Sequence, residues 1–204
     1  MKKTIKTLVI AGGLLFASNF ATGQDLTFGA KGGLNYSMLT GGVSDGNGLG
    51  FHVGGIASYD FSDKMGLRVE LLFSTRALSS TEEIEIIDSK IKTSSTPSFV
   101  AIPVLFNYSF DKISLMAGPQ FSILASYKAE VETTIASLDP VTAEVEGTDG
   151  LRSFSVDIAL GAEYSVSDNM GVSLRYVRAL QSLADSDNDD SRYNVIQLSA
   201  VYKF

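Results

Sequence analysis

The chain of 204 residues contains one histidine, His52, and histidine is the side chain most often used for acid–base chemistry near neutral pH. A lipid-modifying hydrolase would pair it with a carboxylate, such as Asp60 or Asp157, and with a serine nucleophile. No serine in the chain lies within a recognisable esterase or protease motif. We therefore interpret His52 as a packing residue and predict that the protein is not an enzyme.

A second candidate site is the acidic run Asp185-Ser-Asp-Asn-Asp-Asp190, which resembles the start of a calcium-binding loop. Such a loop needs glycine at its sixth position and glutamate at its twelfth, and this chain has Asp190 and Ile196 there. We predict no metal site and no cofactor. It stays open whether this run and the other acidic stretches bind divalent cations weakly. The other stretches contain Glu130, Glu132, Glu144 and Glu146.

A set of charged residues with a shared position in alternating segments is the third candidate. Each of them falls on the polar parity of a segment in which every second residue is apolar. The set is Lys31, Asp60, Arg68, Glu70, Arg76, Asp157, Glu163 and Arg175. Their meaning depends on what the alternating segments form.

Eight segments alternate with period two, which is the pattern of a strand with two different faces. They cover residues 26–38, 49–61, 65–77, 99–110, 113–127, 153–165, 170–180 and 193–204. Away from the strand ends their apolar parity carries no charge, and Arg178, the one charge on it, lies near a loop. An Arg or Lys facing lipid at the bilayer midplane costs about 2–4 kcal/mol, which explains a face cleared of charge.

A soluble barrel has the reverse arrangement, with apolar residues inside and polar residues outside. The sequence therefore predicts an all-β fold, an eight-stranded antiparallel up-and-down transmembrane β-barrel with a polar lumen. Connection lengths agree, because short turns at 62–64, 111–112 and 167–169 alternate with long loops at about 39–48, 78–98, 128–152 and 181–192. Pro103 and Pro119 conflict with uninterrupted strands, because proline removes a ladder hydrogen bond.

The N-terminus predicts export. Lys2, Lys3 and Lys6 precede an apolar run too short to span a bilayer, followed by Ala-Thr-Gly, which together indicate a cleaved signal peptide over residues 1–23. The barrel domain is then residues 24–204. Cleavage removes three lysines and no acid, so the net charge moves from −7 to −10, which disfavours nucleic acid as a partner. The absence of cysteine excludes a lipoprotein anchor and any disulfide.

Aromatic residues gather near the ends of the predicted strands, as in the two aromatic girdles of membrane barrels. The last segment ends on Tyr202-Lys-Phe204. This ending resembles the C-terminal sorting strand of bacterial outer-membrane barrels, and the resemblance implies that Tyr202 and Phe204 form a signal read by the outer-membrane assembly machinery.

The chain resembles the outer-membrane β-barrel domain family common in Bacteroidota, often labelled porin-like or PorT-like. The resemblance rests on the export signal, the alternating segments, Ile102-Pro103-Val104, Ala117-Gly118-Pro119 and the terminal Tyr-Lys-Phe. It suggests that Pro103 and Pro119 are tolerated, at bulges. The resemblance covers essentially the whole mature chain. It implies a location in the bacterial outer membrane and contact with lipid and lipopolysaccharide. We expect a monomer. The family pattern specifies a fold and no activity.

The predicted function is a non-enzymatic membrane protein whose barrel anchors extracellular loops for envelope integrity, adhesion or partner binding. The alternatives are a small channel for ions or solutes and, third, a lipid-modifying barrel enzyme. Eight strands leave an interior just wide enough for side chains, which favours a packed lumen over a pore. Within it we expect Asp60 to pair with Arg68 and Glu163 with Arg175, each pair across one short turn.

Overall fold

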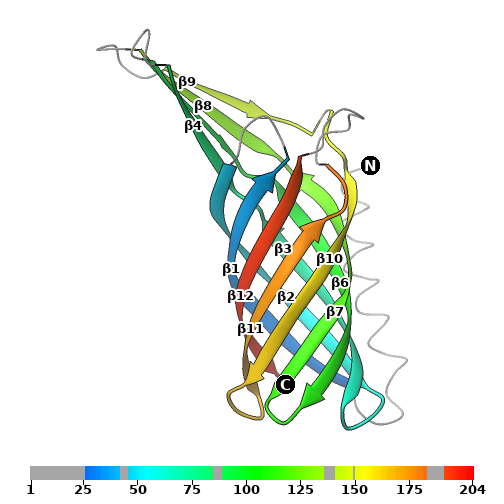
Figure 1. The fold of residues 1–204 in the computed structure, drawn as a ribbon. Coiled ribbons are helices and arrows are strands. Elements are labelled where there is room, and N and C mark those ends of the chain that lie inside the picture. Colours follow the sequence, from blue (N-terminus) through cyan, green and yellow to red (C-terminus); the bar gives the residue numbers. More distant parts are fainter. Residues whose placement is uncertain (1–25, 42–45, 85–88, 136–140, 149, 183–190) are drawn as a thin grey trace.

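The computed structural model describes residues 26–41, 46–84, 89–135, 141–148, 150–182 and 191–204 (Figure 1). The predicted signal peptide and the acidic run at 185–190 lie outside these residues. Every regular element in the described part of the chain is a strand. No helix there is long and apolar enough to cross a membrane.

Eight strands close into an antiparallel barrel, as the alternating segments predict. They are β1 (Leu26–Thr40), β2 (Gly46–Asp60), β3 (Met65–Thr75), β6 (Ser98–Phe110), β7 (Ile113–Ser126), β10 (Phe154–Ser165), β11 (Met170–Ala179) and β12 (Arg192–Lys203). Each pairs with its neighbours in chain order. The barrel closes because β1 pairs with β2 on one side and with β12 on the other, where Gly29 lies opposite Lys203 and Thr40 opposite Arg192.

The two parities of each strand face opposite sides of the barrel wall, because successive side chains in a strand point in opposite directions. In β11 the side chain of Leu174 is 57% exposed on the outer surface, whereas its neighbour Arg175 is 1% exposed in the lumen. The outer surface is apolar along every barrel strand, and the inner surface carries the charged and amide side chains. This is the face assignment that lipid outside the barrel requires.

The two ends of the barrel differ, and we call them the turn end and the loop end. Tight turns at 61–64, 111–112 and 166–169 lie at the turn end, together with the start of β1 and the end of β12 (Figure 1). Asp111, in the shortest turn, adopts a positive φ of 52°, a conformation that aspartate tolerates better than most residues. Longer connections join the strands at the loop end.

The two prolines lie inside strands rather than at bulges, so that expectation is wrong. Pro103 pairs with Gln120 and Pro119 with Ile158 in regular register. The register shift in the β6–β7 ladder lies between Ser98 and Phe99, away from both. Each proline sits beside a short gap in a ladder: β3–β6 pairing skips residues 102–103, and β6–β7 pairing skips 118–119. The gaps fall where a proline has no amide hydrogen to donate.

Two of the predicted long loops are wrong as loops, because they contain four further strands. These are β4 (Leu78–Ile84), β5 (Ser89–Ser95), β8 (Lys128–Ile135) and β9 (Val141–Glu146). They pair in the order β4-β5-β8-β9 and project beyond the loop end as one sheet, which we call the extension (Figure 1). The β5–β8 pairing joins the two connections, so each hairpin supports the other. An isolated hairpin would be only marginally stable.

Candidate functional site: the barrel lumen

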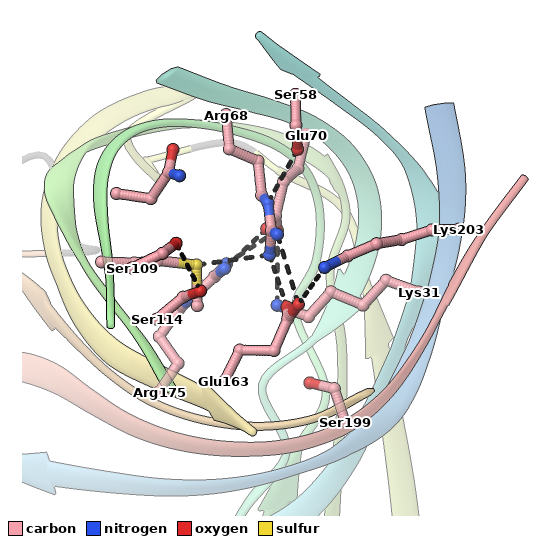
Figure 2. Close-up of polar contacts among 12 residues, drawn as sticks. Lys31, Ser58, Arg68, Glu70, Ser109, Ser114, Glu163, Arg175, Ser199 and Lys203 are labelled. Atoms are coloured by element: carbon pink, nitrogen blue, oxygen red, sulfur yellow. Dashed lines mark hydrogen bonds and ion pairs between the residues drawn. The ribbon is translucent and has the colours of Figure 1, made fainter. Parts of the chain in front are cut away.

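Two buried carboxylates organise the turn-end half of the lumen. Glu70 on β3 accepts hydrogen bonds from both terminal nitrogens of Arg175 on β11, at 2.7 and 2.6 Å. Lys31 Nζ on β1 lies 3.4 Å from the same carboxylate. Figure 2 shows these side chains meeting inside the barrel. All three side chains are fully buried, so one carboxylate links three strands across the lumen.

Glu163 on β10 forms the second such group. Arg68 on β3 donates to both of its carboxylate oxygens, and Arg68 Nε also donates to Ser58 on β2 at 3.1 Å. Lys203 Nζ on β12 lies 3.0 Å from Glu163 Oε1, and its side chain is 26% exposed at the turn end (Figure 2). The two groups together hold four cations and two carboxylates, so this part of the lumen has an excess of positive charge.

A third charged group lies nearer the loop end. Asp157 on β10 is fully buried and accepts hydrogen bonds from Arg76 at 2.6 Å, Ser122 at 2.8 Å and Gln120 at 3.1 Å. The guanidinium carbon of Arg76 lies 4.3 Å from the centroid of the Phe99 ring, within the range of a cation–π contact. The charge of Asp157 is therefore matched by a cation and two neutral donors.

Apolar layers separate and cap the charged groups. One cluster inside the barrel contains Leu105, Met116, Ala159, Val177 and Val195, and another contains Leu78, Ala179 and Tyr193 with Leu39 packed against it. The inward residues of β11 show this order toward the loop end. Arg175 belongs to the Glu70 group, Val177 to the first apolar cluster and Ala179 to the second. The lumen is thus filled in layers along its axis.

His52 links the strands at which the barrel closes. Its Nδ1 lies 2.8 Å from Asn35 Oδ1 on β1, and its Nε2 lies 2.8 Å from Ser199 Oγ on β12. Asn35 Oδ1 can only accept, so Nδ1 carries the proton and Nε2 accepts from the serine hydroxyl. The order serine–histidine–asparagine resembles that of some hydrolases. Here His52 is 1% exposed and Ser199 3% exposed inside the wall, so neither side chain can meet a substrate without local opening.

The structure brings most of the predicted lumen residues into contact, but with different partners. Arg68 pairs with Glu163 rather than Asp60, and Arg175 pairs with Glu70 rather than Glu163. Asp60 is exposed at the turn end and accepts a hydrogen bond from Asn107 at 3.4 Å. Each of these ion pairs crosses the lumen instead of a hairpin turn.

Sequence reasoning missed Lys203 as a member of the Glu163 group. The signal was present, because Lys203 lies on the inward parity of the last strand beside Val201 and Ser199. It also missed the partners of His52, since Asn35 and Ser199 come from opposite ends of the chain. Only closure of the barrel brings those two strands together.

At the loop end of the lumen the described residues leave little room for a solute or metal. A hollow at its loop end, lined by Arg76, Phe99 and Tyr193 among others, measures about 10 Å³, which is space for about one water molecule. Among the described residues no group of three or more His, Cys, Asp or Glu side chains is placed to hold a metal ion. What the arrangement can do is cross-link the wall and obstruct the axis.

The C-terminal residues lie at the turn end on the outer surface. Phe204 is 76% exposed and its backbone N–H donates to Phe28 O at 2.9 Å. Its ring packs edge-on against Tyr202, with centroids 5.6 Å apart. Both rings therefore point away from the lumen, where another protein or lipid can reach them.

A family profile described as outer membrane protein beta-barrel domain matches residues 16–185 of the chain. No curated protein sequence matches the chain.

Several solved outer-membrane proteins are similar in structure. Ail, the attachment invasion locus protein of Yersinia pestis, in complex with the heparin analogue sucrose octasulfate, has 12% identity and a TM-score of 0.48, covering 89% of this chain and 100% of its own. Neisserial surface protein A has 12% identity and a TM-score of 0.48 over the same shares. A major outer membrane protein from Thermus thermophilus has 12% identity and a TM-score of 0.48, covering 86% of this chain and 99% of its own.

Proposed function

The chain belongs to the outer membrane protein beta-barrel domain family, and we propose that this integral outer-membrane barrel is a closed, non-enzymatic anchor that displays its loop-end sheet to partners outside the cell. By the sidedness of such barrels, the turn end faces the periplasm and the loop end the exterior. The display role covers the three functions expected from the sequence: adhesion, partner binding and envelope integrity.

The observation that carries this proposal is the pairing of charges across the lumen. Glu70 and Glu163 each bind an arginine through two contacts and a lysine through one, and Arg76 binds Asp157. Removing one partner of such a buried pair costs about 3–5 kcal/mol, so opening a path through these groups would be expensive. A barrel held shut in this way supports an anchor rather than a channel.

The absence of enzymatic activity is part of the proposal and rests on a separate observation. The Ser199–His52–Asn35 chain of hydrogen bonds is enclosed by the wall, and a hydrolase needs its serine at a surface where substrate can enter. The three residues instead tie together β12, β2 and β1 at the closing seam.

Several finer assignments complete the proposal. The precursor is cleaved after Gly23, which leaves residues 24–204 as the mature barrel domain. Within its family the chain is of the porin-like or PorT-like type found in Bacteroidota. The mature protein is a monomer that contacts lipid and lipopolysaccharide, and the outer-membrane assembly machinery reads Tyr202 and Phe204. N-terminal sequencing of the mature protein tests the cleavage site.

Conductance measurement tests the anchor against the channel. We expect purified, refolded protein with heat-modifiable gel migration to give no steady current in a planar bilayer. A steady current that favours anions would reject the closed barrel and make the small channel the better function, because the excess positive charge near Glu70 and Glu163 would select anions. The Arg175→Ala variant is the matched control, since it loosens the obstruction while the outer surface stays unchanged.

A further inference from the structure

The outer edge of the extension is open. In the described part of the chain, β9 (Val141–Glu146) pairs with β8 on one side and with no strand on the other (Figure 1). An edge strand presents a row of backbone N–H and C=O groups that can pair with another chain. β9 is six residues long and carries Glu144 and Glu146, and charged side chains on an edge strand discourage pairing with strands that do not complement them.

The charges on one face of β8 and β9 are not balanced. Lys128 lies opposite Glu146, and the two side chains form an ion pair at 2.5 Å. That contact raises the pKa of Lys128, because Glu146 accepts a hydrogen bond from its ammonium group. The next pair on the same face is Glu130 opposite Glu144, both exposed. Like charges directly opposite each other in a ladder are destabilising, and a cation beside them would relieve the repulsion.

A hollow on this face extends across the sheet from Ser94 on β5 to Glu144 and Glu146 on the edge strand β9. It measures about 360 Å³, and its lining includes Glu130, Glu144, Glu146 and Lys128. Pockets of this volume hold small-molecule ligands, so the hollow has room for one long basic side chain. On the opposite face of β9 Val141 is 70% exposed and Ala143 is exposed. A strand added at the edge would therefore meet acids on one face and small apolar side chains on the other.

We propose that β9 binds an extended segment of a partner protein by strand addition, and that this segment carries Lys or Arg at alternate positions with aliphatic residues between them. Backbone pairing supplies the affinity and the alternate side chains supply the selectivity. A second copy of this chain is the wrong occupant, because β9 paired with itself would place Glu144 and Glu146 among further glutamates. The proposal specifies the partner chemistry of the display function proposed above and rests on it.

Peptide binding to the folded barrel in detergent micelles tests this assignment. The probe is a fluorescent nine-residue peptide of alternating lysine and valine, followed by anisotropy at about 0.15 M salt, where attraction between distant exposed charges is screened. Two matched peptides serve as controls: one has alternate backbone amides methylated, and the other has glutamate in place of lysine. We expect the probe to bind at least about tenfold more tightly than either control.

Variants of the barrel locate the binding site. Glu144→Gln should weaken binding about two- to fivefold, the range of an exposed charge pair. Adjacent residues direct their backbone N–H groups to opposite edges of a strand, so either Thr142 or Ala143 directs its N–H to the open edge of β9. The proline variant at that residue, Thr142→Pro or Ala143→Pro, should abolish binding. Asp168→Asn, at an exposed acid of the turn end, should leave it unchanged. Heat-modifiable migration of each variant shows that the barrel itself is folded.

If the probe binds, any of three results would overturn the proposal: equal binding of the methylated peptide, equal weakening by Asp168→Asn, or unchanged binding in both proline variants. Absence of binding to a folded, non-conducting barrel would reject strand addition and leave the anchor function standing. A steady current through the barrel would reject the anchor function whatever the peptide does. The two proposals therefore fail in different measurements.

Discussion

Two of the lumen carboxylates, Glu70 and Glu163, each bind two cations, and this ratio determines which substitutions should matter. Glu163 has Arg68 on two oxygens and Lys203 on one, while Glu70 has Arg175 and Lys31 in the same arrangement. The arginines suit this task because a guanidinium matches a carboxylate with two parallel hydrogen bonds. Removing an arginine should therefore be worse than its single charge suggests, since it strips both bonds at once.

Arg68→Ala tests this argument against Arg178→Ala, which removes the same side chain from the outer surface near the loop end. The first change leaves Glu163 buried with Lys203 alone, and we expect unfolding to become easier by about 3–5 kcal/mol. The second removes an exposed side chain and should alter stability by no more than about 0.5 kcal/mol. Urea unfolding of the refolded barrels measures both. Equal midpoints in the two variants would mean that the lumen pairs do not hold the wall together.

The strands show how far local pattern determines this fold. Alternation assigns each side chain of β11 to lipid or lumen, because that depends only on the neighbouring residues in the strand. The partners in the lumen are a different matter: Arg68 and Glu163 are 95 residues apart, and Glu70 and Arg175 are 105 apart. Which of them meet depends on the stagger of the closed barrel. Pairing across the nearest turn was the natural prediction from sequence, and it was wrong for that reason.

The extension was missed for another physical reason. Ala129, Val131 and Thr133 alternate with charged residues as a strand should, but their apolar parity is short and interrupted by threonine. Such a segment has little apolar surface to bury and is predicted as a loop when considered alone. Its order in the structure comes from pairing with β5, a segment from the preceding connection.

The depth of an outward residue should decide how well it tolerates charge. Leu174 lies in the middle of β11, between Leu198 on β12 and Ala162 on β10, whereas Leu180 follows the end of that strand. Leu174→Arg should destabilise the barrel by about 2–4 kcal/mol, and Leu180→Arg by about 0–1 kcal/mol, because the penalty falls toward the interface. Both leucines are exposed on the outer surface, so the pair isolates depth from burial.

Unfolding in lipid vesicles, followed by gel migration without heating, measures this difference. Detergent micelles form a less suitable medium, since a micelle adapts to a surface charge more readily than a bilayer. If Leu180→Arg proved as damaging as Leu174→Arg, the membrane boundary would have to lie beyond the loop end of β11. The extension would then begin inside the bilayer, which its charged face forbids.

The whole barrel joins its first and last strands by a long ladder and by the His52 bridge, so the C-terminal residue contributes little to the finished structure. Phe204 is 76% exposed and makes one backbone hydrogen bond, to Phe28. Its proposed role is in insertion of the chain into the outer membrane. An exposed ring beside Tyr202 at the turn end is available to the assembly machinery before the barrel closes. A signal of this kind should affect the rate of insertion and not the stability of the product.

Deletion of Phe204 separates these two quantities. We expect the free energy of unfolding of the deleted protein, refolded from urea, to lie within about 0.5 kcal/mol of that of the full chain, because an exposed ring with one edge contact contributes little.

In cells we expect slower insertion, seen as protease-sensitive periplasmic protein in a pulse–chase experiment. Replacement of Phe204 by tyrosine keeps an aromatic ring and should restore most of the insertion rate. Phe28→Ala removes a ring at the same end, on the first strand, and should leave the insertion rate unchanged. Normal insertion of the deleted chain would place the sorting information elsewhere in β12, and a large loss of stability in vitro would show that the residue holds the barrel closed.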